Sequence, residues 1–268
     1  MHSLDSFFES IELPVMPEVA HALIKTLNDE NASVTQVRNI IAQDPALSAQ
    51  LLRLANSAHF GLPRGVGTLD DAIAMVGMAQ VRSLSLCTCI CAAFPALPGL
   101  NRTEFWKNSM TCAAYSQWLA ASLGMDSQQA WLTGMMLRLG ELLIGQAEPD
   151  KLLEIEKLPH QPGFRWERET RLVGFNEGQI TAELARRWNF PMQMVQALQR
   201  SSDPLTEQAF SRLGSVVHLA ALLADTPYSG SSMVDTLPID VLDSFQVDVD
   251  WMRSEFPASD SFLDITTA

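Results

Sequence analysis

Residues 44–64 read DPALSAQLLRLANSAHFGLPR and decide the fold class, because they hold a complete signal for one amphipathic helix. Asp44 is suited to cap this helix, and Pro45 falls at the first helical position, where its missing N–H costs no hydrogen bond. Leucines and alanines recur at helical spacing after it. Gly61 and Pro63 then end the helix and its turn. The segment therefore predicts a helix with one buried face.

Polar residues gather at the end of that helix and in the turn after it, namely Arg53, Asn56, Ser57 and Arg64. One interpretation is a contact patch for a partner protein, because polar groups at a helix end and turn are accessible. In the other interpretation, Asn56 and Ser57 satisfy backbone groups at the helix C-terminus while Arg53 pairs with a carboxylate. The sequence leaves both interpretations open.

The remainder of the chain is also helical in pattern, with no convincing strand and no repeat, so we expect an all-α, multi-helical fold. The segment PALPGLN at 95–101 interrupts the pattern with two prolines and a glycine, and we expect the junction of two helical lobes there. Helices are expected over residues 17–28, from 33, from 44, over 68–77, 79–94, 101–124, 126–143, 149–157, 162–172, 176–188, 191–200 and 206–224.

Charge and hydropathy exclude several classes of partner. The chain has 268 residues, with 18 basic against 31 acidic side chains and a formal net charge of −13, which opposes binding to nucleic acid. Its most apolar window, residues 83–94, is too short to span a membrane. The N-terminus carries no secretory signal pattern, so we expect a cytoplasmic protein. The sequence has no coiled-coil heptads, so it gives no indication of an oligomeric state.

Metal-binding residue types are present but do not form a metal-binding pattern. In the CTCIC run, helical geometry puts Cys87 and Cys91 on one face and Cys89 nearly opposite, so these are predicted to be small buried side chains, reduced like Cys112. The histidines are dispersed and none has the paired helical spacing of a metal site. They are His2, His21, His59, His160 and His218.

Residues 13–84 resemble a known family in the order of their motifs: a proline-bounded entry, an aspartate–proline helix start, the RLANSAHFG tip and the TLDDAIAMVGMAQVR helix pair. The family is HDOD, the HD-related output domain of bacterial signalling proteins, and the resemblance extends to about residue 224. It implies an N-terminal helical lobe over 1–97 and a second lobe over 98–224 similar to HD-superfamily phosphohydrolases. The acidic extension over 225–268 lies outside the resemblance.

In those enzymes, histidines and aspartates hold one or two divalent metals that activate water. The resemblance places Leu137 and Arg138 where the histidine–aspartate pair would stand, and neither residue can replace a metal ligand. The other ligand positions hold Asn108, Asn176, Glu177, Ser201 and Ser202. His160 and His218 are expected to lie away from these positions. We therefore expect no metal, no cofactor and no catalytic residue.

The sequence leaves three functions open. The first is a non-catalytic regulatory module that binds signalling proteins. The second is a sensor of a small ligand such as a nucleotide, in which Arg138 contacts a phosphate; the competing interpretation is a salt bridge from Arg138 to Glu141. The third is a metal-dependent phosphohydrolase.

The acidic extension over residues 225–268 holds nine acidic residues and one basic residue. It is either a partner surface or a solvated face. Trp251 and Phe256 predict that at least one of its turns docks on the core.

Overall fold

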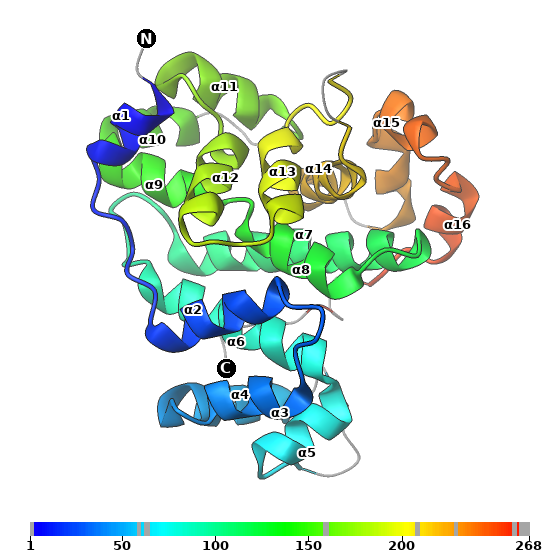
Figure 1. Ribbon diagram of the computed structural model, residues 1–268. Helices are drawn as coiled ribbons and strands as arrows, with labels where there is room; N and C mark the ends of the chain where they lie inside the picture. The colour runs from blue at the N-terminus through cyan, green and yellow to red at the C-terminus, as the bar shows by residue number, and fades with distance from the viewer. Residues whose placement is uncertain are drawn as a thin grey trace.

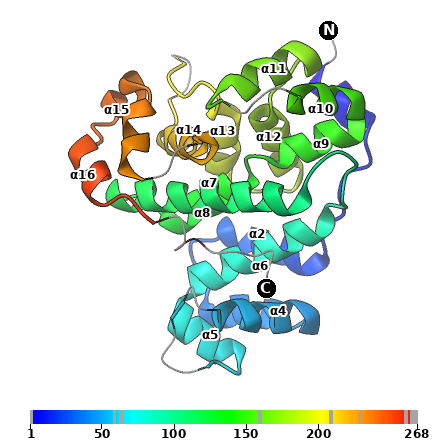
Figure 2. The same cartoon turned by 180° about the vertical axis from the view of Figure 1, so that it is seen from behind.

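The computed structural model describes residues 3–57, 60–61, 65–157, 161–206, 210–227, 230–258 and 262. Over these residues the regular structure consists of helices, and no strand occurs among them. The predicted all-α class is therefore confirmed. Figures 1 and 2 show two helices, α7 and α8, running side by side through the middle of the molecule, with the other helices above and below them.

The lower part of the molecule in Figure 1 is built from the N-terminal helices α2 to α6. Helix α4 begins as its sequence predicts, because the Asp44 carboxylate accepts hydrogen bonds from the backbone N–H groups of Ala46 and Leu47, both at 3.0 Å. Its buried face includes Leu51 and Leu54. The helices of this region are α2 (Glu18–Leu27), α3 (Val34–Ile41), α4 (Pro45–Ala55), α5 (Leu69–Val76) and α6 (Met78–Ala93).

Gly77 separates α5 from α6 with a φ of +96°, a conformation that side chains disfavour. The two helices are bent by 116° at this break. In the described part of the chain no single helix is long and apolar enough to cross a membrane, and this bent pair meets that test only when its two helices are taken together.

The upper part of the molecule in Figure 1 packs on α7 and α8. Helix α14 contacts both of them, and α12 joins α13 to α9. A side chain at Gly134 of α8 would overlap Ser116 of α7, so this glycine allows the two central helices to approach closely. The helices are α7 (Arg102–Ser122), α8 (Ser127–Met136), α9 (Leu139–Ala147), α10 (Pro149–Glu156), α11 (Phe164–Val173), α12 (Glu177–Arg187), α13 (Met192–Arg200) and α14 (Arg212–Asp225).

The helix expected over residues 126–143 is in fact two helices, α8 and α9, which meet at Leu137 and Arg138. Thr181 of α12 lies at the break. Its Oγ1 accepts from the Gly140 N–H at 2.7 Å and donates to the Leu137 carbonyl at 2.9 Å. A side chain inserted into the backbone ladder in this way is a recognised cause of a helix break. The single-helix prediction was wrong because the inserted hydroxyl comes from a distant part of the sequence.

Short helices near both ends of the chain were not predicted. The Arg187 guanidinium of α12 lies over the ring of Phe8 in α1, with its Cζ atom 4.6 Å from the ring centroid. Near the other end, Trp251 stacks on Trp118 with centroids 5.2 Å apart, and the ring of Phe256 lies 5.5 Å from the same indole. The expected docking of Trp251 and Phe256 is therefore confirmed. These elements are α1 (Leu4–Glu9), η1 (Ser231–Thr236), α15 (Ile239–Ser244) and α16 (Val249–Ser254).

The predicted division of the chain into two lobes and an extension, with boundaries after residues 97 and 224, stays a prediction. Two structural features lie across these boundaries. The side-chain amide of Asn28, in the first predicted part, donates to the Asn189 carbonyl in the second at 3.1 Å. Asp225, the first residue of the predicted extension, is the last residue of α14.

Candidate functional site

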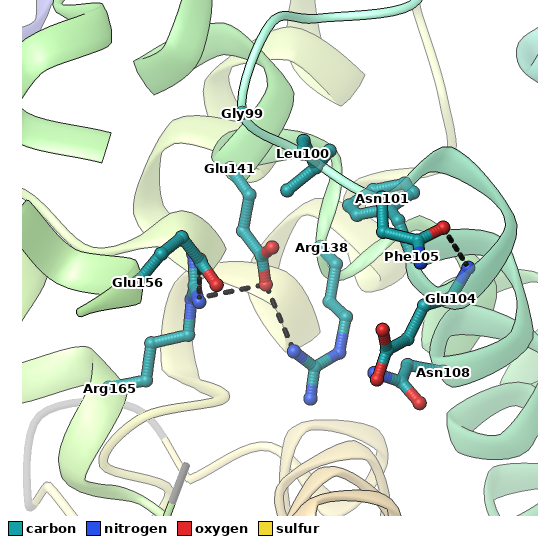
Figure 3. Close-up of a pocket in the computed structure, with 10 residues that line it drawn as sticks. All are labelled: Gly99, Leu100, Asn101, Glu104, Phe105, Asn108, Arg138, Glu141, Glu156 and Arg165. Carbon is teal, nitrogen blue, oxygen red and sulfur yellow. Dashed lines mark hydrogen bonds and ion pairs between the residues drawn. The ribbon is translucent and has the colours of Figure 1, made fainter. Parts of the chain in front are cut away.

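The break between α8 and α9 places Arg138 in the interior, where it is 3% exposed. Its Nη1 donates to Glu141 Oε1 at 2.9 Å, and its Nη2 forms an ion pair with Asp225 Oδ1. The salt bridge between Arg138 and Glu141, one of the two interpretations drawn from the sequence, is therefore present. Figure 3 shows Arg138 with Glu141 on one side and with Glu104 and Asn108 on the other.

A second buried arginine, Arg165 of α11, continues this arrangement. Its Nε donates to Glu169 Oε1 at 2.9 Å and lies 3.1 Å from Glu141 Oε1. Its Nη1 donates to Glu156 Oε1 at 2.6 Å. Glu141 therefore interacts with both guanidinium groups, and it joins Arg138 and Arg165 into one network (Figure 3).

Two further carboxylates complete the network. Glu169 Oε2 accepts the backbone N–H of Glu177 at 2.7 Å, and Glu177 Oε1 accepts from the indole N–H of Trp166 at 2.9 Å. A side chain at Gly140 would overlap the Glu177 backbone, so this glycine lets the start of α9 reach the start of α12. We call this network the ion-pair cluster. Its members are Arg138, Glu141, Glu156, Arg165, Glu169, Glu177 and Asp225.

Burial and like charges perturb the ionisation of this cluster. Burial raises the pKa of Glu169 to about 7, although Arg165 opposes the shift. Burial, together with Glu169 and Glu141, raises the pKa of Glu177 well above its usual value. Burial alone would lower the pKa of Arg138, but Asp225 and Glu141 hold that pKa well above its usual value. The arginines therefore stay charged, and the excess of carboxylates is relieved by protonation.

A cavity of about 190 Å³ lies beside the cluster. Its charged lining consists of two arginines and three glutamates, so it carries no excess of positive charge. Asn108, at a position that the resemblance implies for a metal ligand, lines the same cavity as Arg138 (Figure 3). The lining residues are Gly99, Leu100, Asn101, Glu104, Phe105, Asn108, Arg138, Glu141, Glu156 and Arg165.

The residues at the positions that the resemblance implies for metal ligands do not fit a metal ion. Leu137 is fully buried and offers no side-chain donor, and the guanidinium of Arg138 brings positive charge among the carboxylates. Asn176 Nδ2 donates to Ser202 Oγ at 2.9 Å. Across the described ranges, no group of three or more His, Cys, Asp or Glu side chains is arranged to hold a metal. The carboxylates that gather here are instead paired with arginine.

His218 lies closer to these positions than we expected. Its Nδ1 is 2.7 Å from the carbonyl of Ser201, and its ring stacks on Trp166 with centroids 5.1 Å apart. The expectation that His218 lies well away from the motif positions was therefore wrong, because α14 packs against α13. Burial lowers the pKa of His218, so the ring is neutral at pH 7, with Nδ1–H donating to Ser201. His160 lies outside the described residues.

The polar residues at the end of α4 and in the turn after it, Arg53, Asn56, Ser57 and Arg64, differ in their contacts. The amide of Asn56 donates to the carbonyls of Leu52 and Val66 and accepts from the Val66 N–H, all at 2.8 Å. Asn56 therefore holds the turn to the helix end, as one of the two interpretations predicted. The half-buried Ser57 hydroxyl has no hydrogen-bond partner in the described structure. Arg53 is exposed, and no ion pair to it occurs within the described ranges. Arg64 lies outside them.

The cysteines are buried or half-buried thiols, as predicted. Cys87 and Cys91 share one face of α6, with their Sγ atoms 3.9 Å apart. Burial raises the pKa of Cys89 and of Cys112 to about 12, so both are protonated at neutral pH. A protonated, buried thiol is a weak nucleophile and a poor metal ligand.

The sequence identified some members of the cluster and missed others. Arg165 and Glu169 are four residues apart on one helix, a spacing that predicts an ion pair and that could have identified both. Asp225 and Trp166 gave no such local signal, because their partners Arg138 and Glu177 lie in other parts of the fold.

The chain is similar over most of its length to one protein family. The model of the HDOD domain matches residues 13–204. This agrees with the resemblance seen in the sequence, except that the match ends before α14 and not near residue 224. His218, Leu222 and Asp225 therefore lie beyond the matched segment.

Solved structures are similar to this chain over nearly its whole length. A candidate phosphohydrolase of Shewanella amazonensis is 29% identical with a TM-score of 0.72, over 96% of this chain and 90% of the other. An HDOD domain protein of Geobacter sulfurreducens with unknown function is 19% identical, with a TM-score of 0.71, over 94% and 96% of the two chains. A candidate signal transduction protein of Marinobacter aquaeolei is 21% identical with a TM-score of 0.78, over 100% of this chain and 60% of the other.

Among curated proteins, an uncharacterized protein of Treponema pallidum is 22% identical over 247 residues, or 88% of this chain. The matched region is 46% of that protein, so the chain spans about half the length of this relative.

Proposed function

The chain belongs to the HDOD family, and from this we propose that it is a non-catalytic regulatory module of bacterial signalling that works in the cytoplasm by binding another protein. Family membership does not include three parts of this proposal: that the chain is not an enzyme, that it acts by binding another protein, and that it works in the cytoplasm. Features of this chain's own residues support it.

One observation carries the proposal: the ion-pair cluster, which includes Arg138 and Glu177, two of the residues at the positions that the resemblance implies for metal ligands. Arg138 and Arg165 supply positive charge to the carboxylates, and protonation relieves the remaining excess of carboxylates. A divalent cation would be repelled by two guanidinium groups that lie within 3.1 Å of Glu141. Metal binding would therefore require the cluster to be dismantled, and that cost opposes hydrolysis by a bound metal.

The phosphohydrolase remains the third candidate, because one similar structure at 29% identity carries that name. A shared fold does not establish a shared activity, since activity depends on the residues of the site. In this chain the implied ligand positions hold Leu137, Arg138, Asn108, Asn176, Glu177, Ser201 and Ser202. Glu177 is the one carboxylate among them, and a single carboxylate does not make a phosphohydrolase site.

Arg53 is the residue that best supports a partner surface. Its side chain is exposed at the C-terminal end of α4, and no carboxylate of the described chain pairs with it. Asn56 and Ser57 lie next to it and shape the surface. Arg64, at the end of the same segment, stays in the proposed patch as a prediction from the sequence. A partner with carboxylates at matching positions would complement this tip.

A nucleotide sensor is the second candidate, and one observation favours it. Arg138 Nε and Arg165 Nη2 are buried without hydrogen-bond partners in the described structure, and both residues line the 190 Å³ cavity. Opposing this candidate, Glu104, Glu141 and Glu156 line the same cavity and would repel a phosphate. Calorimetry with a nucleoside monophosphate tests it, because Arg138→Ala must abolish any binding that depends on this contact.

The partner proposal is tested by capture from the native cell followed by mass spectrometry and then by binding to the purified partner. We expect Arg53→Glu to weaken the complex at least about tenfold, because the charge reversal sets like charges against each other. Lys25→Glu makes the same charge change at an exposed position of α2 and serves as the matched control. Equal loss of binding in both variants, or no loss in Arg53→Glu, contradicts the proposed patch.

A further inference from the structure

A second, larger cavity of about 770 Å³ lies between α11 and α14, beside Trp166. Its size falls within the range of about 300–1,000 Å³ that is typical of small-molecule sites. Its lining includes Phe164, Trp166, Ser202, His218, Leu222 and Pro238. The helices α11 and α14 both lie above α7 in Figure 1.

Part of the wall of this cavity is formed by residues outside the segment that the HDOD model matches. That segment ends at residue 204. His218 and Leu222 of α14, Thr236 at the end of η1 and Pro238 at the start of α15 all come after it. The cavity therefore depends on how this chain continues past the matched segment.

Two stacked rings, Trp166 and His218, line the cavity, with centroids 5.1 Å apart and planes inclined by 29°. Both rings are held in place by hydrogen bonds: Trp166 Nε1–H donates to Glu177 Oε1 at 2.9 Å, and His218 Nδ1–H donates to the Ser201 carbonyl at 2.7 Å. Phe164, which also lines the cavity, is 56% exposed, an unusual degree of exposure for a large apolar side chain. Fixed aromatic surfaces of this kind favour a flat, apolar ligand.

Two polar groups next to these rings can orient such a ligand. Because His218 donates from Nδ1, its Nε2 is the acceptor of the neutral ring. Ser202 Oγ accepts from Asn176 Nδ2 at 2.9 Å, so its own hydroxyl proton can be donated. The cavity therefore offers one acceptor and one donor.

The charged residues that line the cavity balance each other. They are Glu167 and Arg171, four residues apart on α11 and both at the surface. The lining consequently has no net formal charge, in contrast to the glutamate-rich first cavity. Nothing here selects an ion, so a neutral ligand is favoured.

We propose that this cavity is a binding site for a neutral, planar heteroaromatic molecule, whose N–H group donates to His218 Nε2 and whose acceptor atom receives the Ser202 hydroxyl proton. The ring system packs against Trp166 and Phe164. The site is separate from the Arg138 cavity, and its existence does not depend on the regulatory function proposed above.

Adenine is a suitable probe, because it is neutral, planar and carries adjacent donors and acceptors. Binding to the full chain is measured by saturation-transfer NMR and calorimetry. We expect saturable binding of adenine and none of cyclohexanecarboxamide, which is neutral but not planar. Failure of adenine to bind up to its solubility limit, or equal binding of the two compounds, overturns the proposal.

Variants then locate the site. Ser202→Ala and His218→Phe each remove one hydrogen bond, and His218→Phe keeps the stacked ring, so each is expected to weaken adenine binding about five- to tenfold. Phe164→Ser weakens it by removing an aromatic surface, whereas Phe210→Ser, at a residue with 50% exposure outside the lining, leaves it unchanged.

If His218→Phe does not fold by circular dichroism, Ser202→Ala and Phe164→Ser decide the question. Adenine affinity that is unchanged in both of these folded variants places any binding elsewhere and overturns the proposal.

Discussion

Arg138 and Asp225 stand 87 positions apart in the sequence and form an ion pair in the interior of the protein. The pair ties the last residue of α14 to the break between α8 and α9. Because Arg138 also binds Glu141, the contact connects α14 to the rest of the ion-pair cluster. The cluster is therefore a tertiary link among several helices, and it includes Arg138 and Glu177, two of the residues at the positions that the resemblance implies for metal ligands.

Removal of the Arg138 guanidinium should strongly destabilise the fold. Arg138→Ala removes this positive partner from the buried Glu141 and the largely buried Asp225, and breaking a buried pair in this way costs about 3–5 kcal/mol. The free energy of unfolding from urea titration at pH 7 measures the loss. Arg53→Ala removes an exposed arginine and should change that free energy by less than about 0.5 kcal/mol. Similar values for the two variants would show that the buried pairs contribute no net stability.

The raised carboxyl pKa values make the stability of the fold depend on pH. Burial raises the pKa of Glu169 to about 7 and that of Glu177 well above its usual value. A group with a raised pKa in the folded state contributes stability that is complete below its unfolded pKa and is lost as the pH rises through the folded one. The contribution of Glu169 should therefore decline between about pH 4.5 and pH 7.

Glu177→Gln isolates the second of these groups, because glutamine resembles the protonated carboxyl and still accepts from the Trp166 indole. We expect the variant to be more stable than the natural chain by at least about 1 kcal/mol above pH 7, with the difference shrinking in acid. Urea titrations across the pH range measure it, and Glu12→Gln at an exposed position is the control. The difference in unfolding free energy between the variant and the natural chain should grow with pH. A difference that falls as the pH rises would contradict the raised pKa of Glu177.

Asn56 should be important for the stability of the N-terminal region. Its amide makes three hydrogen bonds of 2.8 Å to Leu52 and Val66, so Asn56→Ala should lower the free energy of unfolding by about 1–3 kcal/mol. Ser57→Ala, one residue away, removes a hydroxyl that has no partner in the described structure and should be nearly neutral. Thermal unfolding followed by circular dichroism distinguishes the two. If Asn56→Ala is as mild as Ser57→Ala, the amide does not hold the turn.

The aromatic contact of Trp251 should fix α16 on the core. Trp251→Ala removes the stack on Trp118 and should cost about 1–3 kcal/mol, together with loss of near-ultraviolet circular dichroism from the indole pair. Ile239→Ala on α15, where the side chain is 73% exposed, should cost less than about 0.5 kcal/mol. An unchanged near-ultraviolet spectrum in Trp251→Ala would mean that the indoles do not stack in solution.

Local signals in the sequence were sufficient to predict most of the helices. The caps at Asp44 and Ser33 accept the backbone N–H groups that their spacing predicts, and Pro45 stands at a helix start. Helices of six residues, such as α1 and α16, carry too few turns to show a period, and they were missed. The break at Leu137 was also missed, since its cause is the hydroxyl of Thr181 from another helix.

The candidate site was predictable as a set of positions but not as a structure. The spacing of Arg138 and Glu141 predicted their ion pair, because the two residues are one turn apart. The pairing of Arg138 with Asp225 and the contact between His218 and Ser201 arise from helix packing, which no local spacing encodes. The acidic composition of the extension likewise concealed that Asp225 is a largely buried ion-pair partner, with 11% of its side chain exposed, and not part of a solvated face.

Metal content measured together with phosphoester hydrolysis tests most directly whether the ion-pair cluster has replaced a metal centre. The purified chain is assayed by mass spectrometry for bound metals after incubation with Mn²⁺, Mg²⁺ or Fe²⁺, and in parallel for hydrolysis of bis(p-nitrophenyl) phosphate, with Arg138→Ala as the comparison. We predict no stoichiometric metal and no turnover above background. Stoichiometric metal in the natural chain, with turnover that rises and falls with metal content, would contradict a non-catalytic role.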